Sequence, residues 1–113
     1  PEEACGLIGG KPGRGEVVYP IENELHSTSS YRMVPEQQLR AFLDMEQRNL
    51  ECTGIYHSHP LGPDYPSEKD RREFAYPGTV TIIWYPQNGT YLNKGYLLDG
   101  GKVKRIRIYW MDT

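Results

Sequence analysis

Hydrophobic and polar positions along the first third of the chain predict a strand hairpin. Residues 4–10 (ACGLIGG) form a short apolar run that ends in glycines and predicts a buried strand. A turn rich in glycine and proline follows at residues 11–15, and residues 16–21 predict a second strand that pairs with the first. Residues 23–33 are polar, and their pattern fits either a third strand or a loop.

One long helix is predicted to begin at Pro35. Proline suits the first helical position because its missing N–H has no partner there. Four apolar side chains then recur at helical spacing with charged residues between them: Leu39, Phe42, Leu43 and Leu50.

The second half of the chain combines strands with a short helix. Apolar, β-branched and aromatic runs predict four strands, at residues 53–57, 79–85, 90–98 and 102–110, the last two joined as a hairpin around residues 99–101. Residues 60–66 (PLGPDYP) predict a loop. A helix is expected at residues 67–75, with Ser67 as N-cap and an acid at Asp70. Strands and helices that mix without strict alternation predict a single α/β (α+β) domain over residues 1–113, a three-layer sandwich of a mixed β-sheet flanked by helices.

Composition narrows the possible classes of protein. Of 113 residues, 37% are hydrophobic and 25% charged, which is typical of a globular domain and not of a disordered chain. The net charge of −2 provides no basic field for nucleic acid, and no apolar run has the length of a membrane span. We expect a cytoplasmic protein. Free thiols at Cys5 and Cys52 are favoured in a reducing compartment, with a single disulfide as the alternative.

Two histidines and an aspartate form the informative constellation. His57 and His59 stand two apart on a predicted strand, so both imidazoles point to the same face. Pro60 ends that strand, and the loop returns the chain to a helix whose first turn carries Asp70. Two imidazoles and one carboxylate are the ligand set of a catalytic zinc site with an open fourth position. The residues alone also allow a simpler interpretation, in which Ser67 and Asp70 form an ordinary capping box. The third histidine, His26, has no partner at ligand spacing and is expected to be structural or on the surface.

The spacing of these residues resembles a known family. His57-Ser58-His59-Pro60, followed after six residues by Ser67-x-x-Asp70, is similar to the signature of the JAMM or MPN-plus metallopeptidases. The flanks are similar too, since Gly54-Ile55-Tyr56 resembles the family's G-x-Y segment, and Glu3 stands three residues before Gly6 as in its first strand. The resemblance implies a cytidine-deaminase-like fold and one zinc ion, because no histidine or cysteine lies between Asp70 and residue 79 to bind a second.

The resemblance also implies roles for two further residues. Glu3 matches the family's general base, and Ser67 matches the residue that hydrogen-bonds the oxyanion. From the residues alone Glu3 is equivalent to its neighbour Glu2, a solvated charge near the chain end, and only the offset to Gly6 selects Glu3. Members of the family carry a helix before the first strand, so we expect an N-terminal segment to precede Pro1.

Compact members of this family act on ubiquitin-like and sulfur-carrier proteins that end in Gly-Gly, which are therefore the expected partners, with no nucleic acid or membrane involved. Two alternatives stay open, a catalytically silent MPN-type scaffold that only binds proteins and a RadC-like domain associated with DNA repair. Zinc deaminase chemistry is excluded because the H-x-E and P-C-x-x-C motifs are absent. The identity of the carrier, the leaving group and the oligomeric state are not specified by the sequence.

Overall fold

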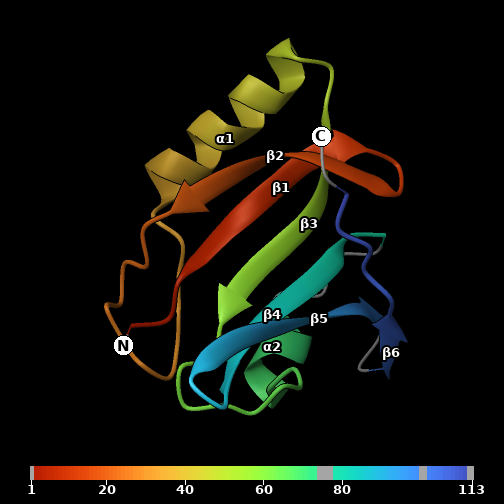
Figure 1. Cartoon of the computed structure of the whole chain (residues 1–113). Coiled ribbons are helices and arrows are strands. Elements are labelled where there is room, and N and C mark those ends of the chain that lie inside the picture. Colours follow the sequence, from red (N-terminus) through yellow and green to blue (C-terminus); the bar gives the residue numbers. More distant parts are fainter. Residues whose placement is uncertain (1, 74–77, 100–101, 112–113) are drawn as a thin grey trace.

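The computed structural model in Figure 1 describes residues 2–73, 78–99 and 102–111. Its elements in chain order are β1 (Cys5–Lys11), β2 (Arg14–Ile21), α1 (Pro35–Gln47), β3 (Glu51–Ser58), α2 (Glu68–Glu73), β4 (Val80–Gln87), β5 (Thr90–Asp99) and β6 (Lys102–Ile106). The predicted mixed α+β domain built on a β-sheet is confirmed.

The six strands form one sheet in the order β2-β1-β3-β4-β5-β6. All neighbouring pairs are antiparallel except β3 and β4, which run parallel. A parallel pair cannot be joined by a tight turn and needs a long crossover, which here contains α2. The crossover begins after the end of β3, and α2 brings Asp70 to within 3.2 Å of His57.

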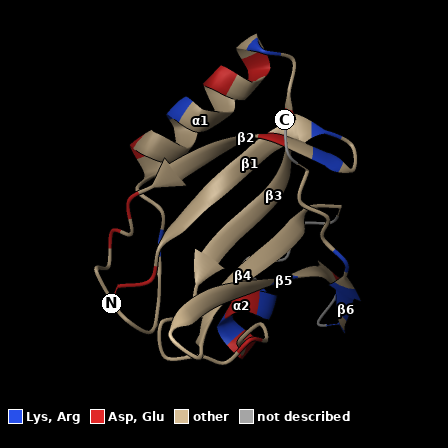
Figure 2. Ribbon diagram, viewed as in Figure 1, with Lys and Arg blue, Asp and Glu red and all other residues tan. Residues whose placement is uncertain are grey.

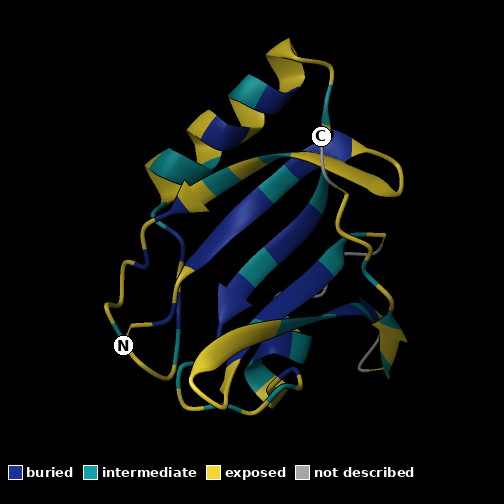
Figure 3. Cartoon of the chain, in the orientation of Figure 1, coloured by how far each residue is buried: buried dark blue, intermediate teal, exposed yellow. Residues whose placement is uncertain are grey.

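The largest core cluster lies between one face of the sheet and α1. Alternate residues of the strands, among them Leu7 of β1 and Ile55 of β3, pack against Ala41 and Met45 of the helix. Figure 3 shows the burial concentrated in the central strands, whereas the outer side of α1 is exposed.

Helix α1 begins at Pro35 as predicted, but three of the apolar residues that indicated it do not face the core. Leu39, Phe42 and Leu43 are 59%, 41% and 50% exposed. The buried stripe is instead Ala41 and Met45, four residues apart, where the small alanine lets the helix approach the sheet. Both sets have helical spacing, so periodicity identified the helix without identifying its inner face.

C-terminal residues contact part of the opposite face of the sheet. Strand β6 ends at Ile106, earlier than the predicted end at residue 110. Beyond it, Ile108 packs on Gly95 at a distance where a β-carbon on the glycine would clash. Further along, the rings of Trp110 and Trp84 lie 5.9 Å apart. Among the described residues, α1 packs on the face that bears Ile55, and Asp70 of α2 contacts His57 on that same face.

The register between β1 and β3 is marked by a close contact of Gly6 with Tyr56. These residues are cross-strand partners, and the tyrosine ring lies over the glycine. A β-carbon at position 6 would come within 2.3 Å of that ring. Only glycine fits here, and the contact keeps β1 in one alignment with the strand that bears the histidines.

The remaining predictions differ from the structure mostly at element ends. Residues 23–33 form a loop closed by an isolated bridge between Asn23 and Met33, so the loop alternative holds. The expected helix at residues 67–75 is observed as Glu68–Glu73, and its last two predicted positions lie outside the described residues, as do turn residues 100–101.

Charged residues of both signs are interspersed along the two helices, whereas β3 and β4 are almost free of charge (Figure 2). Among the described residues, no helix has the length and hydrophobicity that crossing a membrane requires.

Candidate metal centre

Three side-chain atoms converge at the end of β3. The Nε2 atoms of His57 and His59 are 3.0 Å apart, and Oδ2 of Asp70 lies 3.2 Å from the first and 3.3 Å from the second. All three residues are buried, His57 completely. The structure therefore brings together the three residues that the spacing predicted as metal ligands.

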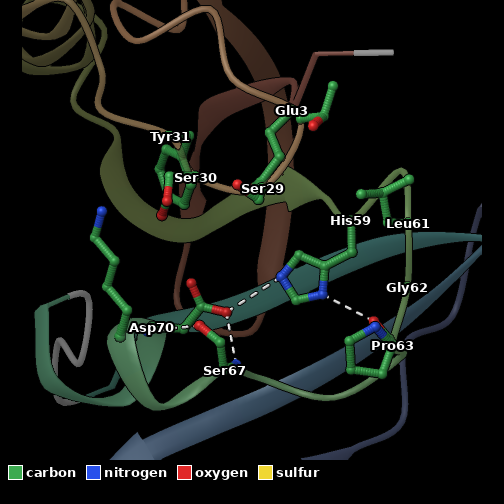
Figure 4. Close-up of a pocket in the computed structure, with 12 residues that line it drawn as sticks. Glu3, Ser29, Ser30, Tyr31, His59, Leu61, Gly62, Pro63, Ser67 and Asp70 are labelled. Carbon is green, nitrogen blue, oxygen red and sulfur yellow. Dashed lines mark hydrogen bonds and ion pairs between the residues drawn. The ribbon is translucent and has the colours of Figure 1, made fainter.

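The local backbone explains how Asp70 reaches this point. Its N–H donates to Oγ of Ser67 at 3.0 Å, and the N–H of Ser67 donates to Oδ2 of Asp70 at 2.8 Å. This reciprocal pair is a capping box at the start of α2. The same carboxylate oxygen lies 3.2 Å from Nε2 of His57 and 3.3 Å from Nε2 of His59, so its capping role is compatible with the predicted role as a ligand. Figure 4 shows Asp70 together with Ser67 and His59.

His59 is oriented by a backbone carbonyl. Its Nδ1 lies 2.8 Å from the carbonyl oxygen of Pro63, and because a carbonyl only accepts, Nδ1 carries the hydrogen. Nε2 is therefore directed at His57 and Asp70. The loop that supplies this carbonyl is held against β5, since the ammonium of Lys94 pairs with the carboxylate of Asp64 and the hydroxyl of Tyr96 donates to its carbonyl.

The protonation of the centre follows from burial and from Asp70. Burial lowers the pKa of His57, against the effect of Asp70, which favours the neutral imidazole that binds metals. Burial opposes charge on His59 too, but Asp70 and the Pro63 carbonyl outweigh it and raise the pKa of His59. Burial likewise opposes ionisation of Asp70, yet hydrogen bonds from the histidines hold the pKa of this carboxyl far below its usual range.

The ring of Tyr31 packs against the imidazole of His57. The two rings stack with centroids 4.7 Å apart and planes 26° from parallel. Nδ1 of His57 is buried and has no hydrogen-bond partner among the described residues. Stacking on Tyr31 therefore restricts the orientation of the His57 ring, because no hydrogen bond from a described residue fixes its Nδ1.

Glu3 lies beside the same centre, whereas its neighbour Glu2 is exposed. An oxygen of the Glu3 carboxylate lies within 4.8 Å of ring nitrogens of His57 and His59. Burial raises the pKa of Glu3 to about 7, an effect that the positive charge of His59 reduces. A carboxyl with a pKa near neutrality suits the gain and loss of protons at physiological pH.

These residues open into a cavity of about 350 Å³. One wall carries His59, Asp70 and Ser67, and Glu3 stands across from them (Figure 4). The remaining lining comes from the polar loop at residues 28–31, from residues 61–63 and from Lys69. Among the described residues, the candidate metal centre thus lies beside an open cavity.

Comparison with known proteins identifies the family. Residues 1–98 match the family described as prokaryotic homologs of the JAB domain, Prok-JAB. The chain belongs to the Prok-JAB family.

Relatives of this Prok-JAB chain include named peptidases. A desampylase of Pyrococcus furiosus is 36% identical over 107 residues, which are 94% of this chain and 74% of the relative. A CysO-cysteine peptidase of Mycobacterium bovis is 38% identical over 85 residues, 74% of this chain and 58% of the relative. The solution structure of a Desulfitobacterium hafniense protein superimposes with a TM-score of 0.85 at 31% identity, covering 99% of this chain and 80% of that one.

The structure also locates the third histidine, the two cysteines and several residues that the sequence did not indicate. His26 is on the surface, where its Nδ1 lies 3.2 Å from Glu2. Cys5 and Cys52 are both free. Sequence reasoning missed Tyr31 and the Pro63 carbonyl, because neither has a characteristic spacing from the histidines. It also missed Asn23, a buried amide that binds its own loop and the backbone of Glu3, 20 positions away.

Proposed function

We propose that this chain is a zinc-dependent peptidase that hydrolyses the bond after the C-terminal Gly-Gly of a ubiquitin-like or sulfur-carrier protein. The observation that supports it most directly is the convergence of His57, His59 and Asp70 within 3.0–3.3 Å of one another beside an accessible cavity. The names of the relatives, desampylase and CysO-cysteine peptidase, support both the reaction and the class of substrate.

The donor set fits zinc. Bonds of about 2.0–2.1 Å directed to the corners of a tetrahedron hold their ligand atoms roughly 3.3–3.4 Å apart. The three distances here are 3.0, 3.2 and 3.3 Å, so little movement would be needed. Glu3 could form a second set with the histidines, but Asp70 contacts both Nε2 atoms directly, and we therefore assign Asp70 as the third ligand. A zinc ion held there would lower the pKa of a bound water to about 7.

Glu3 is assigned as the general base. It is buried, faces the same cavity as the proposed ligands and has its pKa raised to about 7. A carboxylate so placed can accept a proton from water and pass it to the leaving amine.

Ser67 is assigned as the donor to the oxyanion that develops on the scissile carbonyl. Its oxygen accepts the Asp70 N–H with one lone pair, which leaves its own O–H to donate into the cavity. The serine can therefore cap α2 and serve the reaction at the same time.

The names of the relatives support the proposed substrate class, and the burial of the centre is compatible with it. A Gly-Gly tail is thin enough to reach a buried centre, but glycines offer little binding energy of their own. Most of the binding energy must therefore come from contacts with the folded surface of the carrier, and these contacts must position the scissile carbonyl at the metal centre. A scaffold that only binds proteins would need neither the complete ligand set nor Glu3.

The test uses a small ubiquitin-like protein extended beyond its C-terminal Gly-Gly and incubated with the zinc-loaded chain. Intact mass should show loss of the extension, and a bulky residue in place of the penultimate glycine should abolish cleavage. His59→Ala should be inactive, whereas the matched control His26→Ala, which alters an exposed histidine, should cleave normally. Equal cleavage of short unstructured peptides would show a general peptidase and refute the proposed specificity.

A further inference from the structure

Asn23 lies two residues beyond the end of β2 and is only 4% exposed. All the hydrogen-bonding capacity of its amide is directed at backbone groups. Nδ2 donates to the carbonyl oxygens of Glu3 at 3.1 Å and Ser30 at 3.0 Å. Oδ1 accepts from the N–H groups of Leu25 and Arg32, both at 3.1 Å. A buried amide with four partners is costly to replace, because each lost bond leaves a buried polar group unsatisfied.

The partners of Asn23 belong to the loop that walls the cavity. The loop is closed by the bridge between Asn23 and Met33 and by a bond from the N–H of Glu24 to the carbonyl of Arg32 at 2.8 Å. Residues 28–31 of this loop line the cavity, and Tyr31 stacks on His57. The Asn23 amide therefore binds the backbone of the loop that forms one wall of the cavity.

Glu3 depends on the same loop for its backbone position. It precedes β1 and so has no ladder of strand hydrogen bonds to fix it. Its N–H donates to the carbonyl of Ser27 at 2.7 Å, and its carbonyl accepts from Asn23. Both bonds come from the loop, and the second is made by a side chain, which a substitution can remove without changing the backbone sequence of the site.

We propose that Asn23 is a positioning residue that holds Glu3 against the metal centre by joining the backbone of Glu3 to the cavity wall. The proposal rests on the role assigned to Glu3 under the proposed function. Asn23 touches neither substrate nor metal and acts through Glu3. General bases lose effectiveness steeply with displacement, since a shift of about 1 Å can cost about 100-fold in rate.

The decisive variant is Asn23→Asp, which keeps the shape of the side chain but replaces the two N–H donors with an oxygen facing two carbonyls. We expect zinc content to stay at one per chain, KM to change little and kcat to fall by about 10- to 100-fold. In a Glu3→Gln background the same change should lower kcat little further, because residues that act through one another are not additive. Asn93→Asp, the same change at a half-buried site on β5, is the matched control and should behave as wild type.

If the fold-decreases in kcat caused by Asn23→Asp and by Glu3→Gln multiply in the double variant, the two residues act independently. This result would overturn the proposal and leave Asn23 a purely structural residue. A crystal structure of the zinc-loaded Asn23→Asp or Asn23→Ala protein gives a readout independent of activity. A displaced Glu3 carboxylate supports the proposal, and an unmoved one refutes it. If Glu3→Gln alone cleaves at the wild-type rate, the role proposed for Glu3 fails instead, and the position of the carboxylate still decides whether Asn23 holds it.

Discussion

The two walls of the cavity are built by different kinds of interaction. On the metal wall, His59 and Asp70 line the cavity and contact each other and His57 behind them, all through side chains of residues no more than 13 positions apart. On the opposite wall, Glu3 is held through its backbone by a loop that contacts it from 20 or more positions away. Its neighbour Ala4 is fixed to β3 by Ser58, 54 positions distant.

This difference teaches that metal binding and proton transfer can be damaged separately. A change on the metal wall alters the ligand set itself. A change on the Glu3 wall leaves the ligands in contact and alters the position or the chemistry of the base. Each prediction below tests that separation.

The largest effect is expected from Asp70→Ala. The carboxylate contacts both histidines and closes the capping box, so its removal should abolish zinc binding and all peptidase activity. Loss of the cap should also destabilise the fold by about 1 kcal/mol. Elemental analysis and thermal unfolding measure the two effects, with the exposed Asp99→Ala as control. One tightly bound zinc in Asp70→Ala would contradict the ligand assignment.

Glu3→Gln should distinguish the loss of proton transfer from the loss of metal binding most clearly. The substitution keeps the size of a buried side chain and removes its ability to accept a proton, so the zinc content should stay at one while kcat falls by about 10²–10⁴. The neighbouring, exposed Glu2→Gln is the matched control and should retain full activity. A wild-type rate for Glu3→Gln would show that another group is the base.

Ser67→Ala is expected to have the next largest effect, and it lies on the metal wall. If the hydroxyl donates to the oxyanion, kcat should fall by about 10²–10³. Loss of its bond to the Asp70 N–H should cost about 1 kcal/mol of stability. Steady-state kinetics and thermal unfolding on the same sample distinguish these effects. Full activity with slightly lowered stability would leave Ser67 as a helix cap alone.

The smallest predicted effect is a pH dependence of stability in the chelator-treated protein. Burial raises the pKa of Glu3 from its ordinary value of 4.5 to about 7, so the folded state binds more protons than the unfolded state between these pH values. The stabilisation by protonated Glu3 is present below pH 4.5 and is lost as the pH rises through about 7. Denaturant unfolding at several pH values should show the free energy of unfolding of wild type falling relative to Glu3→Gln. Parallel curves would contradict the raised pKa.

The metal wall could be predicted from sequence because its geometry is local. His57 lies on β3 and His59 directly follows this strand, two residues later and on the same side, and a capping box fixes the aspartate one loop later. The Glu3 wall could not be predicted in the same way. Nothing near Asn23 or Tyr31 in the chain indicates that the first would hold Glu3 or that the second would stack on His57.

Local sequence patterns predicted the fold only in part as well. Runs of β-branched and aromatic residues located the strands, and Pro35 located the start of α1. The inner face of α1 was not evident, because Leu39 and Leu43 have the same spacing of four residues as Ala41 and Met45. Packing against a particular sheet chose between two helical faces, and that choice depends on long-range contacts.

The contact of Gly6 with Tyr56 restricts how related sequences can diverge. Because a β-carbon at position 6 would meet the tyrosine ring, a larger residue there requires a smaller one at position 56. Two segments far apart in the chain should therefore be inherited as one unit, with substitutions at the two positions occurring together. The spacing from Glu3 to Gly6 should be inherited with them, since one inserted residue would shift the glutamate relative to β1 and so to the loop that binds its backbone.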